Sequence, residues 1–303
     1  MAKLRGAIPT PRHRLAAAVP YGIRGATPAQ WLVIPQILSE WLNDQFGDCV
    51  SAEEAFNKAA SGILISDLTV QTWARAHNVL NGAYLDEVLD WMASAGFAQD
   101  GNTYNDGGKA AVDWTNAAAL QNAIAQSPVK IGVAANQIET AVNTTNDRSG
   151  WFGIGWTRDQ NIDHCVALCG YGTLAWLAAQ LGVSVPTGVN GSAPGYALYT
   201  WKTIGIVDVP SMLAVTAEAW SRTPSTVVIG SNPPTPDPVV TPTPVPPSPP
   251  VPPSPPVPPP PPVPPRRPPG INFDFALRRA IRTGGTLTIP GVPAMPVGTY
   301  SVD

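Results

Sequence analysis

The sequence predicts an α+β protein with two unlike lobes, followed by a proline-rich linker and a short C-terminal segment. Helical hydrophobic patterns dominate up to about residue 126 and strand patterns follow them, an order typical of α+β proteins. Of the 36 prolines, 23 lie between Pro233 and Pro269. Because proline lacks an amide donor and has a fixed φ, that stretch favours an extended polyproline II conformation and divides the chain.

The elements of the globular part follow from hydrophobic spacing. Residues 1–30 carry five basic side chains and four prolines, which predicts an extended N-terminal arm on the surface. The globular domain is expected at 31–230. Apolar residues at helical spacing predict helices at 31–42, 48–60, 66–80, 84–95 and 116–126. Apolar runs then predict strands at 129–135, 164–172 and 196–201, with a last helix at 211–220.

Two segments follow this domain. Residues 231–269 are expected to form a rod-like spacer of about 3.1 Å per residue. A P-x-x-P-x-R match ending at Arg266 offers the alternative of a ligand for an aromatic-lined groove. Residues 270–303 are too few to hold a core of their own. We expect them to be a small interaction segment for a protein partner, with a partly disordered end as the alternative.

Composition argues against several classes of partner. The net charge of −3 provides no positive field for a polyanion, so no nucleic-acid partner is expected. Three cysteines are an odd number and do not suggest a disulfide framework. The apolar run 15–20 is too short for a signal peptide, and glycines and polar residues interrupt the charge-free stretch 165–201. We therefore expect a cytoplasmic protein without a membrane span.

A candidate nucleophile lies at the start of the second predicted helix. Asp48 is a plausible N-cap, which places Cys49 in the first helical turn. The positive end of a helix favours a thiolate, the nucleophilic form of cysteine. The alternative interpretation is that Cys49 packs inward as a small apolar residue.

A candidate base lies at the start of a predicted strand. His164 directly follows Asp163 and opens an apolar run, whereas His13 lies in the arm and His77 inside a predicted helix. Cys165 and Cys169 are expected in the core, because no second pair of ligands accompanies them. No metal or other cofactor is therefore expected.

Together these motifs resemble the papain-like cysteine peptidases. The similarity consists of an Asn or Gln shortly before a helix-opening cysteine, a D-H-x-V-x-x-x-G-Y-G strand at 163–172, and an aromatic strand ending in Trp201. It covers roughly residues 40–220. The resemblance implies a helical lobe with the cysteine, a β lobe with the histidine, and a site in the cleft between them. A wider group of bacterial and phage proteins on this fold makes association with a phage particle an alternative location.

The resemblance also implies roles for individual residues. Cys49 would be the nucleophile and His164 the general base. Either Gln45 or Asn43 would donate to the oxyanion, and Trp201 would shield the histidine from water. The residue that orients the histidine stays open, since the family's asparagine position holds another residue here. The candidates are Tyr199, Thr200, Asn190 and Asp208.

Two functions follow. The first is a thiol hydrolase that cleaves a peptide or isopeptide bond of a peptide or protein substrate through an acyl-enzyme. The alternative is a catalytically silent papain-like module that binds or supports other proteins at the end of the proline-rich spacer.

Overall fold

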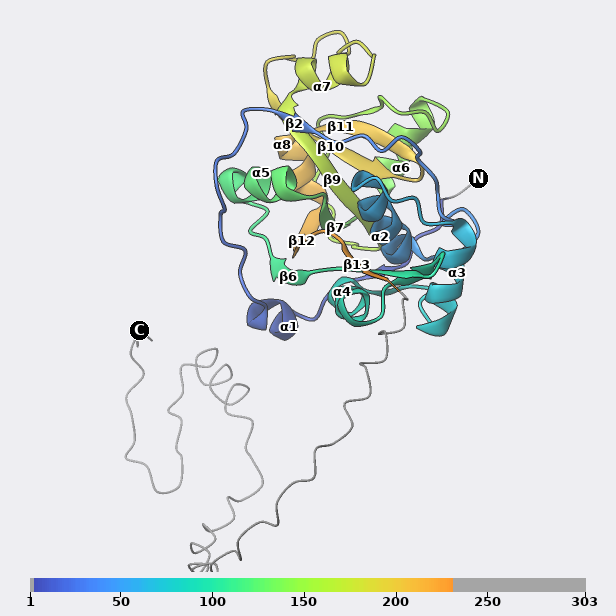
Figure 1. Ribbon diagram of the computed structural model, residues 1–303. Coiled ribbons are helices and arrows are strands. Elements are labelled where there is room, and N and C mark those ends of the chain that lie inside the picture. The colour runs from blue at the N-terminus through green and yellow to red at the C-terminus, as the bar shows by residue number, and fades with distance from the viewer. Residues whose placement is uncertain (1–2, 231–303) are drawn as a thin grey trace, which may run out of the picture. The chain divides into compact units, whose positions relative to one another are not determined.

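The computed structural model describes residues 3–230 of the chain (Figure 1). By its contacts the chain divides into two units, Met1–Val239 and Val240–Asp303, and every described residue belongs to the first. The predicted linker at 231–269 and the predicted interaction segment at 270–303 lie outside the described residues.

A largely antiparallel sheet forms the centre of the described part. Its strands lie in the order β6-β12-β7-β9-β10-β11-β8, and β2 pairs with β9 off this path. Eight of the ten residues of the long central strand β9 are buried, as expected for an apolar strand covered on both faces. The strands are β2 (Trp31–Leu32), β6 (Gly108–Ala111), β7 (Val129–Val133), β8 (Phe152–Gly153), β9 (His164–Thr173), β10 (Pro194–Thr200), β11 (Thr203–Asp208) and β12 (Thr216–Thr223).

Helices cover both faces of β9, because side chains alternate along a strand. Cys165 and Ala167 belong to the core that contains α2, whereas Val166 and Leu168 belong to the core that contains α5 and α6. Figure 1 shows α2 against the sheet, with α3 and α4 beside it. The helices are α1 (Arg12–Ala17), α2 (Cys49–Ala60), α3 (Asp67–Ala76), α4 (Leu85–Ser94), α5 (Ala117–Gln126), α6 (Asn136–Thr144), α7 (Leu174–Gln180) and α8 (Val209–Val215).

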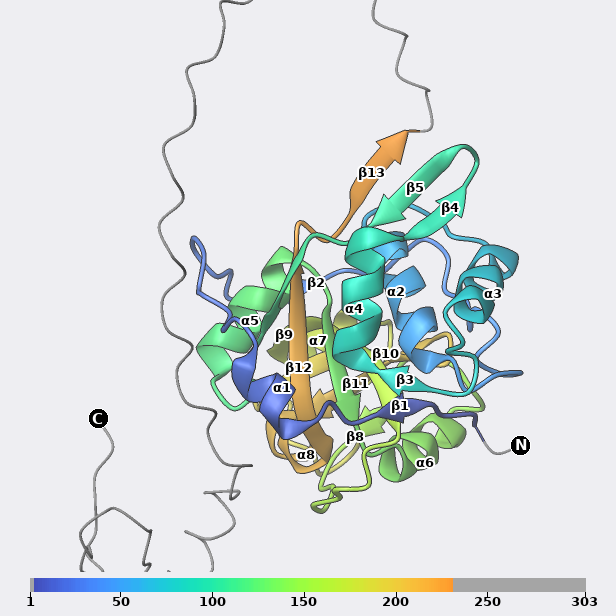
Figure 2. The same cartoon turned by 90° about the horizontal axis from the view of Figure 1, so that it is seen from below.

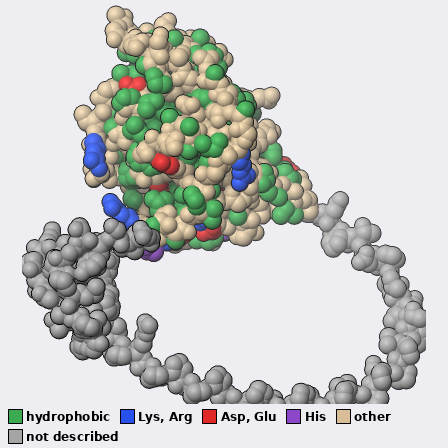
Figure 3. Space-filling model, turned by 90° about the vertical axis from the view of Figure 1, so that its left-hand side faces the viewer, with side chains coloured by type: hydrophobic (Ala, Val, Ile, Leu, Met, Phe, Trp, Pro, Cys, Tyr) green, Lys and Arg blue, Asp and Glu red, His purple; other side chains and the backbone are tan. Residues whose placement is uncertain are grey.

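Two small sheets complete the fold. β13 (Val227–Gly230), β5 (Asn102–Asn105) and β4 (Phe97–Gln99) form one antiparallel sheet. β1 (Ala7–Ile8) runs parallel to β3 (Ala83–Tyr84) in the other (Figure 2). The face in Figure 3 carries few charged side chains among hydrophobic and uncharged ones, in line with a chain that is only 13% charged.

The architecture confirms the predicted α+β class, with a cysteine on a helix of one lobe and a histidine on a strand of the other. Three local predictions are wrong. The helix expected at 31–42 is replaced by β2 and irregular chain, because Pro35 interrupts the pattern. The arm at 1–30 is not extended throughout, since α1 forms within it. The helix expected at 211–220 ends at Val215, where β12 begins and pairs with β7 and β6.

Within residues 3–230, no helix combines the length and apolarity needed to cross a membrane.

Candidate active site

Cys49 is the first residue of α2 and is 2% exposed. Its Sγ accepts a hydrogen bond from the backbone N–H of Cys165 at 3.4 Å, and the backbone N–H of Gly6 also points to it. Burial raises the pKa of the Cys49 thiol to about 12, although these two N–H groups act in the opposite direction. In this closed arrangement the sulfur is therefore a neutral thiol at neutral pH.

His164 is the first residue of β9 and is 1% exposed. Its Nε2 lies 2.7 Å from the hydroxyl of Thr200, and its ring stacks on Trp201 with centroids 4.2 Å apart. The other ring nitrogen, Nδ1, is buried without a hydrogen-bond partner. Burial, together with the positive charge of Arg5, lowers the pKa of His164 to about 3, so the imidazole is neutral.

The fold brings these two residues together although 115 positions separate them in the sequence. The amide that contacts the Cys49 sulfur is the one that joins Cys165 to His164. The Cys49 thiol therefore lies next to the peptide bond between His164 and Cys165.

Of the four candidates for orienting His164, only Thr200 contacts its ring within the described residues. Thr200 and Tyr199 point to opposite faces of β10, and the Tyr199 hydroxyl donates instead to Ser39 O at 2.7 Å. Asn190 is exposed and accepts a hydrogen bond from Ser192 N. It lies in the loop before the N-terminal end of β10, whereas Thr200 is the last residue of that strand. Asp208 caps α8 by accepting from Ser211 N.

The two candidate oxyanion donors lie in the loop before α2. Asn43 is buried, and its side-chain amide donates to Phe46 O at 2.9 Å. Gln45 is exposed to solvent. Neither side-chain amide is hydrogen-bonded to Cys49, and the N–H groups that contact its sulfur are those of Cys165 and Gly6.

A segment near the N-terminus covers the Cys49 thiol and the His164 ring, and sequence reasoning did not predict this. Residues 3–8, which we call the N-terminal strap, run between the two lobes (Figure 2). On the helical side Gly6 O accepts from Ala83 N at 2.9 Å, and on the sheet side Ala7 N donates to Asp163 O at 3.0 Å. A Cβ on Gly6 would lie 1.6 Å from Gly47 O, so only glycine permits this approach.

Polar contacts hold the strap to the β lobe. The Arg5 guanidinium binds Asp163 at 2.7 Å and Glu139 at 2.5 Å, and it also donates to Asn136. The Trp201 indole donates to Leu4 O at 3.2 Å. The open cleft implied by the family resemblance is therefore closed here, and the surface arm expected at 1–30 lies partly inside the molecule.

The residues that permit this closure, Arg5 and Gly6, are visible in the sequence, but the residues they contact lie far away along the chain.

Within residues 3–230, no group of three or more His, Cys, Asp or Glu side chains is arranged to hold a metal ion.

No protein-family model and no curated protein matches the sequence. Solved structures similar to the chain include the ragweed pollen allergen Amb a 11, a cysteine protease, in its proform, with 13% identity and a TM-score of 0.48 over 72% of this chain and 63% of that one. The recombinant stem bromelain precursor has 12% identity and a TM-score of 0.47 over 73% and 77%. The bromelain protease of Ananas comosus in complex with the E64 inhibitor has 13% identity and a TM-score of 0.46 over 64% and 98%. The chain thus spans less than two thirds of the Amb a 11 proform, and these similarities concern the papain-like fold alone.

Proposed function

We propose that the chain is a thiol hydrolase that cleaves a peptide or isopeptide bond through Cys49 and His164, and that its N-terminal strap holds the site closed. One observation carries the proposal. The Cys49 sulfur lies at the start of α2 against the His164–Cys165 peptide bond, while Thr200 holds Nε2 of His164 and leaves Nδ1 without a partner.

The reaction follows from this arrangement once the strap is displaced. Nδ1 of His164 takes the proton from Cys49, and the thiolate attacks the substrate carbonyl carbon. The backbone N–H of Cys49 stabilises the oxyanion, and a side-chain amide adds to it if Asn43 releases Phe46 O or Gln45 turns inward. His164 then protonates the leaving amine, and water releases the acyl group from the thioester.

Thr200 would act as a positioning residue in this scheme. Its hydroxyl fixes the tilt of the imidazole and the ring nitrogen that faces the thiol, as the third member of a triad does. Trp201 covers one face of the ring and limits its access to water.

The test compares Cys49→Ala with Cys169→Ala, both in a Gly6→Val background that releases the strap. Hydrolysis of casein labelled with a self-quenching fluorophore should be lost with Cys49→Ala. It should persist with Cys169→Ala, because Cys169 is a buried core residue without a role in the proposed reaction. Iodoacetamide should modify Cys49 faster than the other two cysteines, with an apparent pKa below the reference of about 8.5.

The burial of both groups beneath the strap favours a second candidate, a silent papain-like module. An alkylation pKa above about 9 and no casein cleavage after the strap is released would favour that module over the hydrolase.

A further inference from the structure

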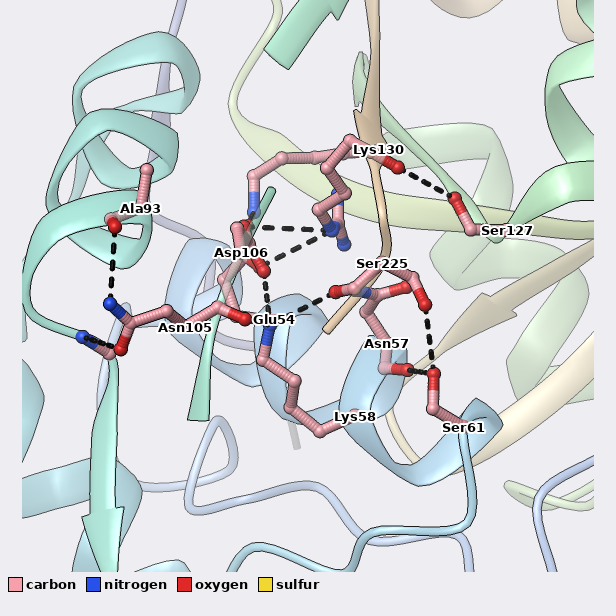
Figure 4. Close-up of polar contacts among 12 residues, drawn as sticks. Glu54, Asn57, Lys58, Ser61, Ala93, Asn105, Asp106, Ser127, Lys130 and Ser225 are labelled. Atoms are coloured by element: carbon pink, nitrogen blue, oxygen red, sulfur yellow. Dashed lines mark hydrogen bonds and ion pairs between the residues drawn. The ribbon is translucent and has the colours of Figure 1, made fainter. Parts of the chain in front are cut away.

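Six charged side chains lie in the core between α2, β7, β12 and the loop after β5, and each is 0% exposed. We call them the buried charge cluster, and Figure 4 shows much of it in close-up. Fully buried charges carry a large desolvation cost unless each is paired and hydrogen-bonded. The members are Glu53, Glu54, Lys58, Asp106, Lys130 and Arg222.

The charges of four of the six residues cancel one another. Lys130 Nζ binds Glu53 at 2.7 Å and Glu54 at 2.6 Å. Arg222 binds Glu53 with contacts of 2.7 and 2.9 Å. Two cations therefore face two carboxylates, and this part of the cluster is neutral without the remaining pair.

The remaining pair consists of Lys58 and Asp106, whose Nζ and Oδ1 atoms are in contact. Lys58 Nζ also donates to the backbone oxygens of Asn105 and Ser225, each at 3.2 Å, and these bonds hold the amine against the carboxyl group (Figure 4). Lys58 lies on α2, nine residues or about 13 Å along the helix from Cys49.

Glu54 supplies a third group to this pair. It lies one helical turn before Lys58 on α2, so the two side chains share a face. Glu54 Oε2 and Asp106 Oδ2 are both buried without a hydrogen-bond partner, although the Nε of Arg222 lies 3.5 Å from the first and 3.7 Å from the second. A single proton between these two carboxyl groups would satisfy both oxygens.

The electrostatics place that proton on Asp106. Burial and the negative charge of Glu54 raise the pKa of Asp106 to about 7. Burial also disfavours the charge on Glu54, but Arg222, Lys130 and Lys58 outweigh it and lower the pKa of Glu54 to about 2. The site therefore presents an amine, a carboxylic acid and a neighbouring carboxylate in a dry environment.

We propose that Lys58 and Asp106 condense into an intramolecular isopeptide bond, with Glu54 as the proton-transfer group. One proton passes from the Lys58 ammonium group to the Asp106 carboxylate in contact with it, which leaves a neutral Nζ beside a carboxylic acid. Nζ then attacks Cγ of Asp106, and Glu54 moves one further proton from the nitrogen to the departing hydroxyl. An N–C bond forms, a C–O bond breaks and one water molecule leaves, so no oxidant or activating co-reactant is needed. The product removes two buried ionisable groups and links α2 covalently to the loop after β5.

The test begins with the intact mass of the folded full chain, measured after denaturation. The cross-linked chain should weigh about 18 Da less than its sequence, the mass of one water. Proteolysis should yield a branched peptide that joins the segments around Lys58 and Asp106. A full chain of unchanged mass, or a loss of water that maps elsewhere, would overturn the proposal.

Variants assign the roles. Lys58→Arg keeps the positive charge but cannot form the amide, so the mass deficit should disappear. Lys130→Arg is the matched control, because Lys130 is equally buried but belongs to the balanced part of the cluster, and it should retain the deficit. Glu54→Gln should slow the appearance of the deficit after synthesis. A deficit that persists in Lys58→Arg would contradict the assignment even if the wild-type chain loses water.

Discussion

At the scale of single residues, the hydroxyl of Thr200 is the only hydrogen-bond partner of the His164 ring among residues 3–230. Thr200→Val keeps the shape of the side chain but leaves Nε2 buried and unpaired, which costs roughly 1–3 kcal/mol. We expect alkylation of Cys49 in the strap-released background to fall about tenfold to a hundredfold. Thr200→Ser retains the hydroxyl and should react within about threefold of the parent. Equal rates for the valine and serine variants would contradict the positioning role.

Asp48, directly before the nucleophile, gives a second prediction at this scale. Both of its carboxyl oxygens are buried without partners, and burial raises its pKa to about 7 from an ordinary value of 3.8. Between these values the folded protein holds a proton that the unfolded chain has lost. The protonated acid therefore stabilises the fold at low pH, and this contribution is lost as the pH rises through 7.

Asp48→Asn should consequently become more stable than the parent as the pH rises from 5 to 9, by about 2–4 kcal/mol at the upper end. Urea unfolding at several pH values measures this difference. Asp100→Asn, at an exposed position whose charge is not among those that act on Asp48, is the control and should show no such trend. A constant difference across the pH range for Asp48→Asn would contradict the prediction.

Sequence reasoning selected Cys49 and His164 as candidates because each carries a local signal, a helix start for the first and a strand start for the second. It could not choose among Thr200, Tyr199, Asn190 and Asp208. That choice depends on the register between β9 and β10, which shifts between Ala197 and Leu198. A β-bulge reverses which residues share a face, and a non-local pairing of this kind leaves no trace in the spacing of one strand.

At the scale of elements, the N-terminal strap depends on the absence of a side chain at residue 6. Gly6→Val would place a Cβ against Gly47 O, so the strap cannot keep its path. We expect iodoacetamide to modify Cys49 at least about tenfold faster in this variant, because local opening replaces burial. Mass spectrometry of digested samples quantifies the modification.

Gly22→Val is the matched control in the same arm, since nothing lies within 4 Å of a Cβ built there. It should leave the rate unchanged. A Gly6→Val protein that melts like the parent and reacts at the parental rate would show that the strap does not limit access to the thiol.

The helices α2, α3, α4 and α5 were predictable because their apolar residues repeat at helical spacing. Capping side chains, Ser66 and Asn116, also mark the starts of α3 and α5. β12 was not predictable from the sequence. Its Ala-containing start resembles a helix, but pairing with β7 and β6 gives the backbone hydrogen bonds on both edges, and this overrides the local preference for a helix.

At the scale of the whole molecule, residues 3–230 form two hydrophobic cores and three sheets among themselves. A chain ended at Val239 should therefore melt within a few degrees of the full chain and show the same alkylation rate at Cys49. Thermal melts followed by circular dichroism test the first expectation. A markedly lower melting temperature would mean that residues beyond 239 contribute to the fold.

The order of helices before strands was enough to predict two unlike lobes, because local periodicity sets the type of each element. The closure of the cleft was not predictable, since it joins residues 3–8 to partners about 40 to 200 positions away.

Under the proposed function, the strap would divide the protein into a closed and an open population. If only the open form reacts, the rate of Cys49 modification equals the open fraction multiplied by the intrinsic rate of an uncovered thiol. Every 1.4 kcal/mol or so that the contacts of Arg5 and the Trp201–Leu4 hydrogen bond add to closure makes the open fraction about tenfold smaller. A ligand that binds residues 3–8 would raise this fraction without approaching the thiol. The latency of the chain is then a tunable equilibrium, with amide exchange at Ala7 and Ala83 as its direct measure.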